Sequence, residues 1–414
     1  MSKIVEEKTW LCPAPFEGLT ISPTGHITLC CVTPHEQFLG HISQYSSLEK
    51  AYNSEPMNLV RQMFTDKKGR NIPQCKVCWD KIDSGEQSYF DELKVKDGNK
   101  TRPHFDEDFE KEYKTIRFLE FSTSNICNAT CSMCNGMFSS KWLPYEEQAP
   151  SWRKGTTHGT DAELYRMTDN DIRKILEVLP TLDELVIKGG EPFADYNNLK
   201  ILERLNECNS TAKLSITTNF HIIPPKFMDA IIERKKVHNT VFQFIGSIDA
   251  TGDLYEWIRS TYFLRTVDTM KRLYENTGLK YIISPTISLY NFFNLADIVE
   301  YFHDKEYVGR IAMKKIVSTP KYCSPMMLPK QIINDTITEF QTKIADKNKN
   351  ISFLNVDDNS LIGDNYFGTE IYDENKDRIW EWIDYIDSMR YNDLKLLEIV
   401  PRFKTLKDEL EQYK

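Results

Sequence analysis

The sequence predicts an α/β fold whose central region is a parallel sheet built from alternating strands and helices. Six short apolar runs of strand length lie between residues 116 and 317, and stretches with helical spacing separate them. Strands joined by helices pair in parallel through right-handed crossovers. A cysteine-rich segment, residues 1–91, precedes this region, and a mostly helical pattern follows it over residues 331–414. We therefore expect a small N-terminal module, an α/β domain and a helical C-terminal region.

Composition and charge limit the classes of partner. The chain has 414 residues, 40% hydrophobic and 27% charged, enough for one large domain and a smaller one. Its net charge of −9, without a block of lysine or arginine, argues against a nucleic acid as the main partner. No apolar run reaches membrane-spanning length, and the first residues lack the apolar core of a signal peptide. We expect a cytoplasmic protein without a membrane partner, whose ten cysteines are metal ligands rather than disulfides.

The N-terminal segment contains five of the ten cysteines. Two alternating runs in residues 19–31 flank a Pro-Thr-Gly turn, which predicts a β-hairpin whose second strand carries Cys30. Cys31 should then point to the opposite face of that strand. Residues 48–64 have the spacing of an amphipathic helix. The pattern predicts a small module held by four thiolates, although the spacing also permits a zinc site, with ligands Cys12, Cys30, Cys75 and Cys78.

Three more cysteines follow the first strand of the α/β region, residues 116–121. Cys127, Cys131 and Cys134 form a C-x3-C-x2-C array. Thiolates are the ligands of iron–sulfur clusters, and three thiolates on a four-iron cluster leave one iron open to a chelating small molecule. From the spacing alone, a zinc knuckle or a set of buried structural cysteines is the alternative.

The C-x3-C-x2-C array after the first strand resembles the signature of the radical S-adenosylmethionine (radical SAM) enzymes. The resemblance implies a partial (β/α)6 TIM-like barrel, here residues 115–330. It also implies a 4Fe–4S cluster on Cys127, Cys131 and Cys134, with the methionine part of SAM chelating the fourth iron.

The N-terminal segment resembles the twitch half of the SPASM domain, the auxiliary-cluster module of many radical SAM enzymes. The matching features are Cys12, Gly25 followed by Cys30, a helix start near residues 47–55, and the pair Cys75 and Cys78. The resemblance implies a second, auxiliary 4Fe–4S cluster on the four cysteines. In the best-known radical SAM enzymes with this module, the module follows the barrel, whereas here it precedes the barrel.

The remaining elements are predicted in order along the chain. Residues 92–114 are polar and charged and read as a linker, and residues 144–165 read as an inserted loop. A capping box at Thr168 and Asp171 opens the first helix after this loop. The C-terminal run 379–386, rich in aromatic residues, is expected to form a packed surface helix. The further strands are expected at 185–188, 213–217, 241–248, 281–287 and 311–317, and the further helices near 199–206, 226–234, 263–274 and 295–302.

Polar residues follow the predicted strands, where ligands of parallel α/β folds bind. Gly189-Gly190-Glu191-Pro192 follows the second strand. Glycines allow close approach of the backbone to a ligand, and a carboxylate suits an ammonium group. The segment also resembles the family's GGE motif, which implies contact with the amino group of SAM. A strand–helix turn is the alternative interpretation.

Further candidates for SAM binding lie after the third, fourth and fifth strands. In related enzymes a serine and an arginine hold the carboxylate or ribose of SAM, which implies such a role for Ser247 and Arg259. Strand-end caps and a surface salt bridge between Asp249 and Arg259 are the alternatives. The resemblance further implies that Ser288 and Asn291, after the fifth strand, flank the adenine of SAM, and that the thioether of Met133 packs on the adenine. These cofactor-binding candidates are Thr218, Asn219, Ser247, Asp249, Arg259, Ser288, Asn291 and Met133.

Two residues are candidates for acting on the substrate. Lys188 ends an otherwise apolar strand, where its ammonium is suited to hold a substrate carboxylate; extension to solvent is the alternative. Cys323 follows the sixth strand, where a thiol near a carbon radical would donate hydrogen; a buried inert cysteine is the alternative.

The resemblance implies reductive cleavage of SAM to a 5′-deoxyadenosyl radical, which abstracts hydrogen from a substrate carbon. We expect a peptide-like substrate and an electron donor such as flavodoxin or ferredoxin. One alternative is a radical SAM dehydrogenase or rearrangement enzyme acting on a sugar, a nucleotide or another small metabolite. Another is a metal-stabilised binding protein without catalysis. The sequence leaves the reaction type open between oxidoreductase and transferase or lyase.

Overall fold

A computed structural model describes most of the chain. The described residues are 12–33, 37–83, 88–90, 93, 115–153, 163–237, 242–313, 315–317, 320–347, 351–353 and 368–412. The predicted linker therefore lies outside the described residues except for Leu93, as does the middle of the predicted inserted loop. The division of the chain into four segments stays a prediction.

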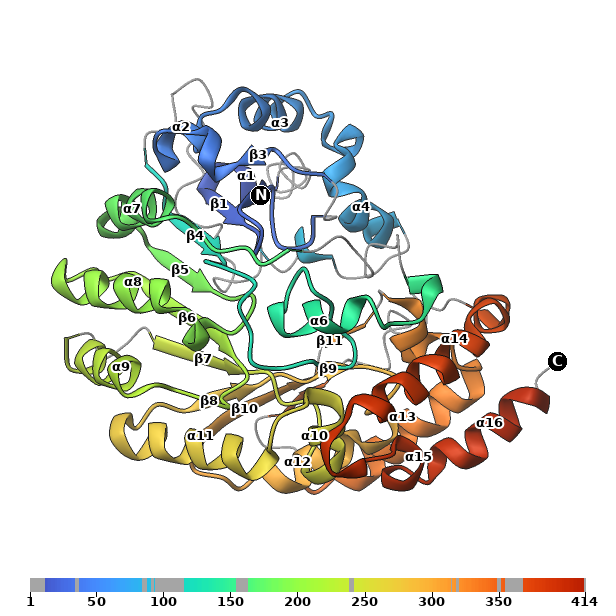
Figure 1. The fold of residues 1–414 in the computed structure, drawn as a ribbon. Coiled ribbons are helices and arrows are strands. Elements are labelled where there is room, and N and C mark those ends of the chain that lie inside the picture. The colour runs from blue at the N-terminus through green and yellow to red at the C-terminus, as the bar shows by residue number, and fades with distance from the viewer. Residues whose placement is uncertain are drawn as a thin grey trace, which may run out of the picture.

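The predicted α/β fold class is confirmed. Within the described part of the chain, ten strands form one sheet in the order β12-β10-β8-β7-β6-β5-β4-β1-β2-β3. From β12 to β1, each strand is parallel to its neighbour in this order. Figure 1 shows the strands fanning from β1 and β4 at the top to β8 and β10 below. The strands are β1 (Gly18–Ile21), β2 (His26–Thr28), β3 (Gly40–His41), β4 (Phe118–Phe121), β5 (Glu184–Ile187), β6 (Lys213–Thr218), β7 (Phe242–Gly246), β8 (Tyr281–Ile283), β10 (Val308–Met313) and β12 (Ile351–Phe353).

The strand residues alternate between two faces of the sheet. Leu119, Leu185 and Leu214 lie side by side in register, and all are fully buried. On this outer face Tyr281 donates a hydrogen bond from its hydroxyl to the Met270 carbonyl of a covering helix, so this face packs against the helices. The opposite, inner face carries mostly polar or half-buried side chains. Because side chains alternate along each strand, strands paired in this register place apolar side chains together on the outer face and mostly polar side chains together on the inner face.

Helices that connect the parallel strands cover the outer face (Figure 1). The capping box that opens α7 is confirmed, since the Thr168 hydroxyl accepts from the Asp171 N–H while Asp171 accepts from the Thr168 N–H. One helix, α10, was not predicted from the sequence. These helices are α7 (Asp169–Val178), α8 (Tyr196–Glu207), α9 (Pro225–Val237), α10 (Gly252–Arg259), α11 (Phe263–Thr277) and α12 (Leu295–Phe302).

Two of the predicted strands are interrupted. The run predicted as 281–287 divides into β8 and β9 (Thr286–Ile287), because Pro285 between them has no N–H to donate to a ladder. The run predicted as 311–317 likewise continues from β10 into β11 (Lys315–Ile316). Strands β9 and β11 pair with each other in parallel, as a small sheet that extends the two longer strands.

The N-terminal module joins the same sheet. The predicted hairpin is present as the antiparallel pair β1 and β2, and β1 pairs in parallel with β4 over its whole length. The second strand ends at Thr28, so Cys30 lies in the following turn rather than on the strand as expected. The expected single helix over 48–64 divides at Ser54, which precedes a helix with Pro56 in its first turn. The module's helices are α1 (Ala14–Glu17), α2 (Leu48–Tyr52), α3 (Glu55–Thr65) and α4 (Lys76–Asp83).

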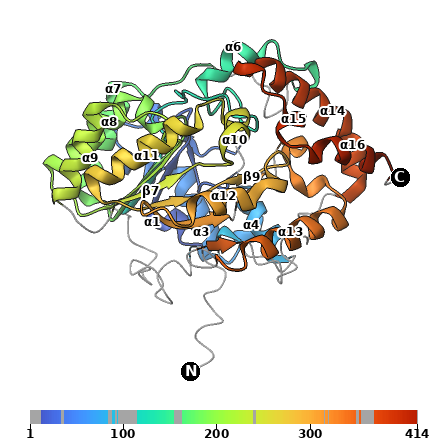
Figure 2. The same ribbon diagram turned by 90° about the horizontal axis from the view of Figure 1, so that it is seen from below.

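Of the C-terminal helices, α14 lies next to the short helix α6 (Leu143–Glu146), as Figure 2 shows, and the Tyr385 hydroxyl of α14 donates to the Tyr145 carbonyl. The predicted aromatic helix is present within α14, but it is more buried than a surface helix, since Trp382, Ile383 and Ile386 are fully enclosed. The helices are α13 (Lys330–Ile344), α14 (Gly368–Met389), α15 (Leu396–Ile399) and α16 (Arg402–Gln412). None of the described helices is long and apolar enough to span a bilayer.

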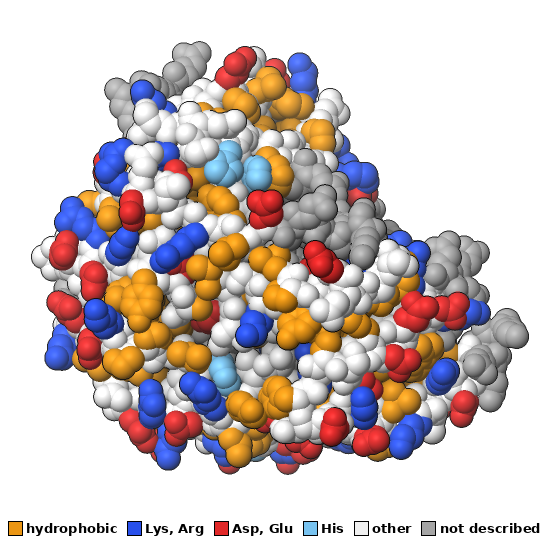
Figure 3. Space-filling model, viewed as in Figure 1, with side chains coloured by type: hydrophobic (Ala, Val, Ile, Leu, Met, Phe, Trp, Pro, Cys, Tyr) orange, Lys and Arg blue, Asp and Glu red, His pale blue; other side chains and the backbone are white. Residues whose placement is uncertain are grey.

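The surface seen in Figure 3 carries acidic and basic side chains interspersed along its left and lower margins. No single-sign stripe of the kind that binds a nucleic-acid backbone stands out on this face.

Candidate functional site

The loop that carries Cys127, Cys131 and Cys134 leaves the carboxyl end of β4. Asn125 fixes its start, donating through its side-chain amide to the Gly136 carbonyl and accepting from the Tyr165 N–H. Loops lack the repeating hydrogen bonds of helices and strands, so side chains must satisfy their backbone groups. Here the Ser139 hydroxyl donates to the Ala129 carbonyl, and the Trp142 indole donates to the Cys131 carbonyl.

The three thiols of this loop suit a metal cluster rather than free ionisation. Cys131 is buried, and Cys127 and Cys134 are half-buried. Burial, with the nearby thiol of Cys131 and carboxyl of Glu191, raises the pKa of Cys127 to about 12. Burial also raises the pKa of Cys131 and of Cys134. Thiols in such surroundings become thiolates when a bound metal compensates their charge.

The spacing of protein ligands differs between a single metal ion and an iron–sulfur cluster. Within the described part of the chain, no three His, Cys, Asp or Glu side chains are grouped closely enough to bind one metal ion. A four-iron cluster holds each thiolate on a different iron, so its ligands lie further apart than those of a single ion. The donor set of the loop is three thiols, which fits a four-iron cluster with one open iron.

The predicted Gly-Gly-Glu segment packs directly against the cysteine loop. Gly189 and Gly190 have φ values of 78° and 53°, a region that favours glycine. A Cβ on Gly190 would lie 2.3 Å from the Ile126 carbonyl oxygen, and a Cβ on Gly189 would lie 2.0 Å from the Ser122 hydroxyl. The Glu191 N–H donates to the same Ile126 carbonyl at 2.8 Å. The glycines are therefore required for close contact with the loop, which goes beyond an ordinary strand–helix turn.

Glu191 presents a buried carboxyl group beside the loop. Its side chain accepts from the Thr218 hydroxyl at 2.6 Å and from the Asn219 N–H at 2.8 Å. Burial raises its pKa to about 7, although these hydrogen bonds oppose the shift. Glu191 makes no ion pair with a described residue, and the side-chain nitrogen of nearby Asn128 is buried without a hydrogen-bond partner. A ligand ammonium would supply the cation that this carboxyl lacks.

The predicted residues of the fourth and fifth strand ends form one buried network. Asp249 and Arg259 are paired at 2.6 Å, and the pair is buried rather than on the surface. Asp249 also accepts from the Thr286 N–H, and its own carbonyl accepts from the Asn291 amide. Asn291 in turn accepts from the N–H and hydroxyl of Ser288. The network meets the cysteine loop, because Arg259 donates to the Cys131 sulfur at 3.6 Å.

Other predicted site residues are Ser247, Met133, Pro192 and Cys323. The N–H of Ser247 donates to the Thr218 carbonyl. Met133 is half-buried in the cysteine loop, and Pro192 begins a short 3-10 turn after Glu191. Cys323 is fully buried between the Tyr290 hydroxyl at 3.2 Å and the Ser132 carbonyl, and its pKa is raised to about 12 by burial. None of these placements tests a role in SAM binding or hydrogen donation, which stay predictions.

Sequence reasoning missed two buried arginines that hold the cysteine loop from outside. Arg153 donates to the Cys134 carbonyl at 2.9 Å. Arg390, which follows α14, donates to the Thr130 carbonyl at 2.9 Å. Burial lowers the pKa of Arg390 to about 10, which leaves it cationic at neutral pH. No local pattern marks either residue, since both reach the loop only through the fold.

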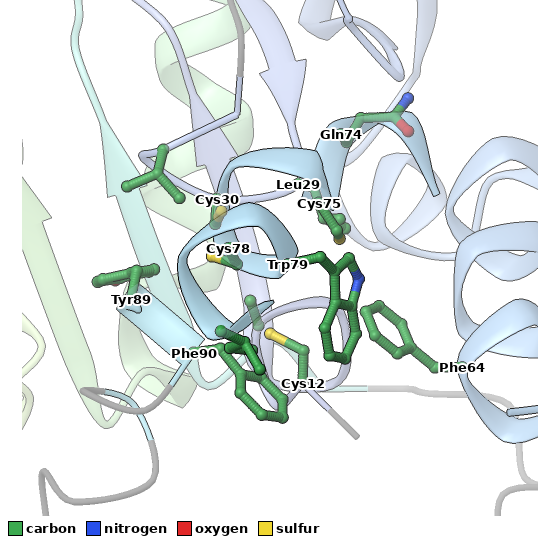
Figure 4. A pocket seen from close by; sticks show the side chains of 13 residues that line it. Cys12, Leu29, Cys30, Phe64, Gln74, Cys75, Cys78, Trp79, Tyr89 and Phe90 are labelled. Carbon is green, nitrogen blue, oxygen red and sulfur yellow. The ribbon is translucent and has the colours of Figure 1, made fainter. Parts of the chain in front are cut away.

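The four N-terminal cysteines line one cavity (Figure 4). They come from separate parts of the module. Cys12 precedes α1 and Cys30 follows β2, while Cys75 immediately precedes α4 and Cys78 lies in the first turn of that helix. Burial raises the pKa of Cys12 well above its ordinary value, and the three other thiols add to the effect. Apolar side chains complete the lining, among them Leu29, Phe64, Trp79 and Phe90. The structure thus brings together the four predicted thiols in a largely apolar setting.

Cys31 takes a different direction from its neighbour. It does not line this cavity, whereas Cys30 does; burial raises the pKa of Cys31 to about 11, with Lys188 opposing the shift and Glu120 and Cys30 adding to it. The expected separation of Cys30 from Cys31 is therefore present, although it arises in a turn closed by Thr33 rather than on a strand.

Comparisons with known proteins bear on this arrangement. Residues 12–79 match the family model SPASM, described as an iron-sulfur cluster-binding domain, which confirms the predicted SPASM-like module. No curated protein matches the chain.

Among solved structures, the chain is similar to three proteins at low identity. The first is Streptococcus suis SuiB bound to precursor peptide SuiA (TM-score 0.40, 14% identity, 58% of this chain and 49% of that chain). The second is anSMEcpe with bound AdoMet (0.39, 13%, 55% and 62%). The third is a radical SAM methyltransferase from Sphaerobacter thermophilus (0.36, 15%, 58% and 67%). The chain spans about half the length of the SuiB chains that it matches.

Proposed function

We propose that the chain is a radical SAM enzyme that abstracts hydrogen from a carbon of a peptide-like substrate. The observation that carries the proposal is the contact between the cysteine loop and the Gly-Gly-Glu segment. It puts three thiols next to a buried carboxyl group, Glu191, that makes no ion pair with a described residue, since nearby Arg259 is paired with Asp249. When bound, a 4Fe–4S cluster and SAM would supply a 5′-deoxyadenosyl radical from an electron delivered by a donor such as flavodoxin or ferredoxin.

The residues of the chain have separate tasks in this proposal. Cys127, Cys131 and Cys134 would hold the cluster, and Glu191 would orient the ligand ammonium with Thr218 and Asn219 fixing its carboxyl. Arg259 keeps a positive charge beside Cys131 because Asp249 holds it in place. Helix α14 and the arginines behind the loop exclude water from its outer side.

A second cluster on Cys12, Cys30, Cys75 and Cys78 is part of the proposal. Four protein thiolates leave no iron of that cluster open, so its role would be electron transfer or structure rather than substrate coordination. The match of residues 12–79 to a cluster-binding domain supports it. A peptide-like substrate is proposed because enzymes with the module that the sequence resembles often modify peptides.

The proposal is tested by anaerobic reconstitution with iron, sulfide and SAM, followed by reduction and mass spectrometry for 5′-deoxyadenosine. The wild-type protein should hold two clusters, about eight irons per chain, and form 5′-deoxyadenosine. Cys127→Ala, Cys131→Ala and Cys134→Ala should each abolish the product.

Cys208→Ala is the matched control, because Cys208 follows α8, where its thiol donates to the Leu205 carbonyl, and it belongs to neither cysteine group. It should keep the wild-type rate. Product formation at that rate by any of the three loop variants would refute the proposal, and zinc bound at the four N-terminal cysteines would refute its second cluster.

A further inference from the structure

One side chain beside the proposed SAM site carries a hydrogen-bond donor that no described residue accepts. Asn128 lies in the cysteine loop, directly after Cys127. Its side-chain nitrogen, Nδ2, is buried and has no hydrogen-bond partner among the described residues. Buried polar groups in folded proteins are almost always paired, because an unpaired group has lost its water and gained nothing in return. The Asn128 amide therefore indicates an acceptor that the described part of the chain does not supply.

Neighbouring groups fix which end of the Asn128 amide is unpaired. The His221 backbone N–H donates to Oδ1 of Asn219 at 2.9 Å, so the other end of the Asn219 amide, Nδ2, must be a donor. This Nδ2 donates to Oδ1 of Asn128 at 2.8 Å. A reversed Asn128 amide would bring two donors together, so its Oδ1 is the end that faces Asn219. The unpaired group is therefore an N–H donor, and its missing partner is an acceptor.

Printed contacts join this donor to the carboxyl group of Glu191. The Asn219 backbone N–H donates to Oε2 of Glu191 at 2.8 Å, while the side chain of the same Asn219 holds Asn128. A second contact comes from the loop, because the Glu191 N–H donates to the carbonyl of Ile126, two residues before Asn128. One residue thus fixes both the amide of Asn128 and the carboxyl group of Glu191, at the carboxyl end of β6.

The two predicted cations near this site already have carboxylate partners. Arg259, which the resemblance implies for the carboxylate or ribose of SAM, pairs with Asp249 at 2.6 Å and donates to the Cys131 sulfur. Lys188 pairs with Glu120 at 2.5 Å. Breaking either pair would leave a buried carboxylate without its cation, which is strongly unfavourable. The donor that remains is an uncharged amide, which adds no charge beside the thiols.

We propose that Nδ2 of Asn128 donates to the α-carboxylate of SAM, so that Asn128 and Glu191 together recognise the amino-acid end of the ligand. An α-ammonium and an α-carboxylate are bonded to the same carbon atom, so a ligand whose ammonium binds Glu191 brings its carboxylate close by. An ionised carboxylate only accepts hydrogen bonds, which matches the unpaired donor. A hydrogen bond to such a charged acceptor is about twice as strong as one between neutral groups.

This inference rests on the proposed function, because it adds a positioning residue to the same ligand site. Asn128 would hold one end of SAM and take no part in bond cleavage. The assignment also makes the site selective, since a ligand with the amine but without the carboxylate would leave the Asn128 donor unpaired. Selectivity for the carboxylate is therefore the property that the test must measure.

The test compares two ligands by calorimetry on the full-length, cluster-loaded protein. One ligand is SAM, and the other is decarboxylated SAM, which keeps the adenosine, the sulfonium and the amine. Asn128→Ala should weaken SAM binding about tenfold to hundredfold, the loss expected for one hydrogen bond to a charged group. It should change the affinity for decarboxylated SAM by less than about twofold, because that ligand offers the amide no carboxylate.

A second variant reverses the selectivity. Asn128→Asp keeps the oxygen that accepts from Asn219 and replaces the donor with a negative charge. It should weaken SAM binding more than Asn128→Ala does, and it should bind decarboxylated SAM at least as tightly as the wild type, since this ligand has no negative group. Asn170→Asp, which adds the same charge at an exposed asparagine of α7, is the control and should change neither affinity.

Three results would overturn the assignment. Equal weakening of the two ligands by Asn128→Ala, or a lower iron content in that variant, would show that the amide only shapes the loop. A changed reduction potential of the SAM-free cluster on the loop, with an unchanged ratio of the two affinities, would identify a cluster sulfur as the acceptor. Formation of 5′-deoxyadenosine by the wild-type preparation would show that any such failure concerns Asn128 and leaves the proposed function standing.

Discussion

At the scale of single residues, the burial of Glu191 makes both stability and ligand binding depend on pH. It is 2% exposed, and its carboxyl pKa is raised to about 7, whereas an unfolded glutamate titrates near about 4.3. The native protein therefore keeps a proton that the unfolded chain has released. Stability of the SAM-free protein should fall as pH rises from about 4 to about 7, by about 4 kcal/mol in total, and change no further above that range.

The first prediction concerns the pH dependence of SAM affinity. The charged carboxylate is the form that binds an ammonium, so affinity should rise about tenfold per pH unit below pH about 7. It should fall again above about pH 8, where an α-amino group loses its proton. Calorimetry on the reconstituted protein measures both limbs. Glu191→Gln should bind more weakly and lose the rising limb, and an unchanged rising limb in this variant would contradict the assignment.

The second prediction separates two adjacent cysteines. Cys30 lines the cavity of the N-terminal module, whereas Cys31 does not. Cys30→Ala should lose the auxiliary cluster, seen as a loss of about four irons per chain, and Cys31→Ala should keep it. Loss of the cluster should also destabilise the module, which hydrogen exchange of the β1 amides would report as reduced protection. Equal iron content in the two variants would rule out this ligand set.

At the scale of elements, α14 is the support of the cysteine loop. Trp382 is fully buried, donates from its indole to the Ser132 carbonyl at 2.8 Å, and stacks on Trp142. The Arg153 guanidinium lies 4.2 Å above the Trp382 ring while it donates to Cys134. A helix more than 200 residues away along the chain thus fixes the loop that would bind the cluster.

The third prediction tests that support. Trp382→Ala should lower the free energy of unfolding by about 3–5 kcal/mol, because it leaves a cavity and an unsatisfied carbonyl. Iron at the loop should be lost together with stability. Thermal unfolding and iron analysis are the measurements, and Trp380→Ala on the same helix is the control because Trp380 is only half-buried. A larger effect from Trp380→Ala than from Trp382→Ala would argue against α14 as the support.

At the scale of the whole molecule, the N-terminal module and the α/β region share one sheet and one core. Strand β1 pairs with β4, and Leu19, Ile21 and Ile27 belong to the same hydrophobic cluster as the leucines of β4 and β5. In the family that the sequence resembles, the module follows the barrel, whereas here it precedes it. The fold permits this order because the module joins the sheet at the β4 edge.

The fourth prediction follows from the shared core. Leu19 is 1% exposed, so Leu19→Ala should cost about 2–5 kcal/mol, and it should shift the unfolding of the module and of the α/β region together. Tryptophan fluorescence and hydrogen exchange on peptides of each region report the two transitions. Leu59→Ala, at a leucine of the same module that is 56% exposed, should change stability by less than about 0.5 kcal/mol. Separate transitions that respond only in the module would contradict one cooperative unit.

The sequence alone determined the features that short windows of residues encode. Hydrophobic periodicity located the six parallel strands from β4 to β10 to within a few residues, but it missed the interruption at Ser284 and Pro285 and the short parallel strand β12, which lies in the region predicted to be helical. The spacing of Cys127, Cys131 and Cys134 and the later Gly-Gly-Glu segment predicted a site, since each motif is local and the strand order brings their ends together. The hairpin and the Cys75–Cys78 pair likewise predicted the module that matches a cluster-binding domain.

Only the tertiary structure decided the contacts between residues far apart in the chain. The pairing of β1 with β4 and the approach of Arg153 and Arg390 to the cysteine loop have no periodic or spacing pattern that marks them. A buried arginine looks like any surface charge in a sequence, because burial depends on which distant segments cover it. The curvature and strand order of the sheet supply that information, and with it the charges that surround the proposed active site.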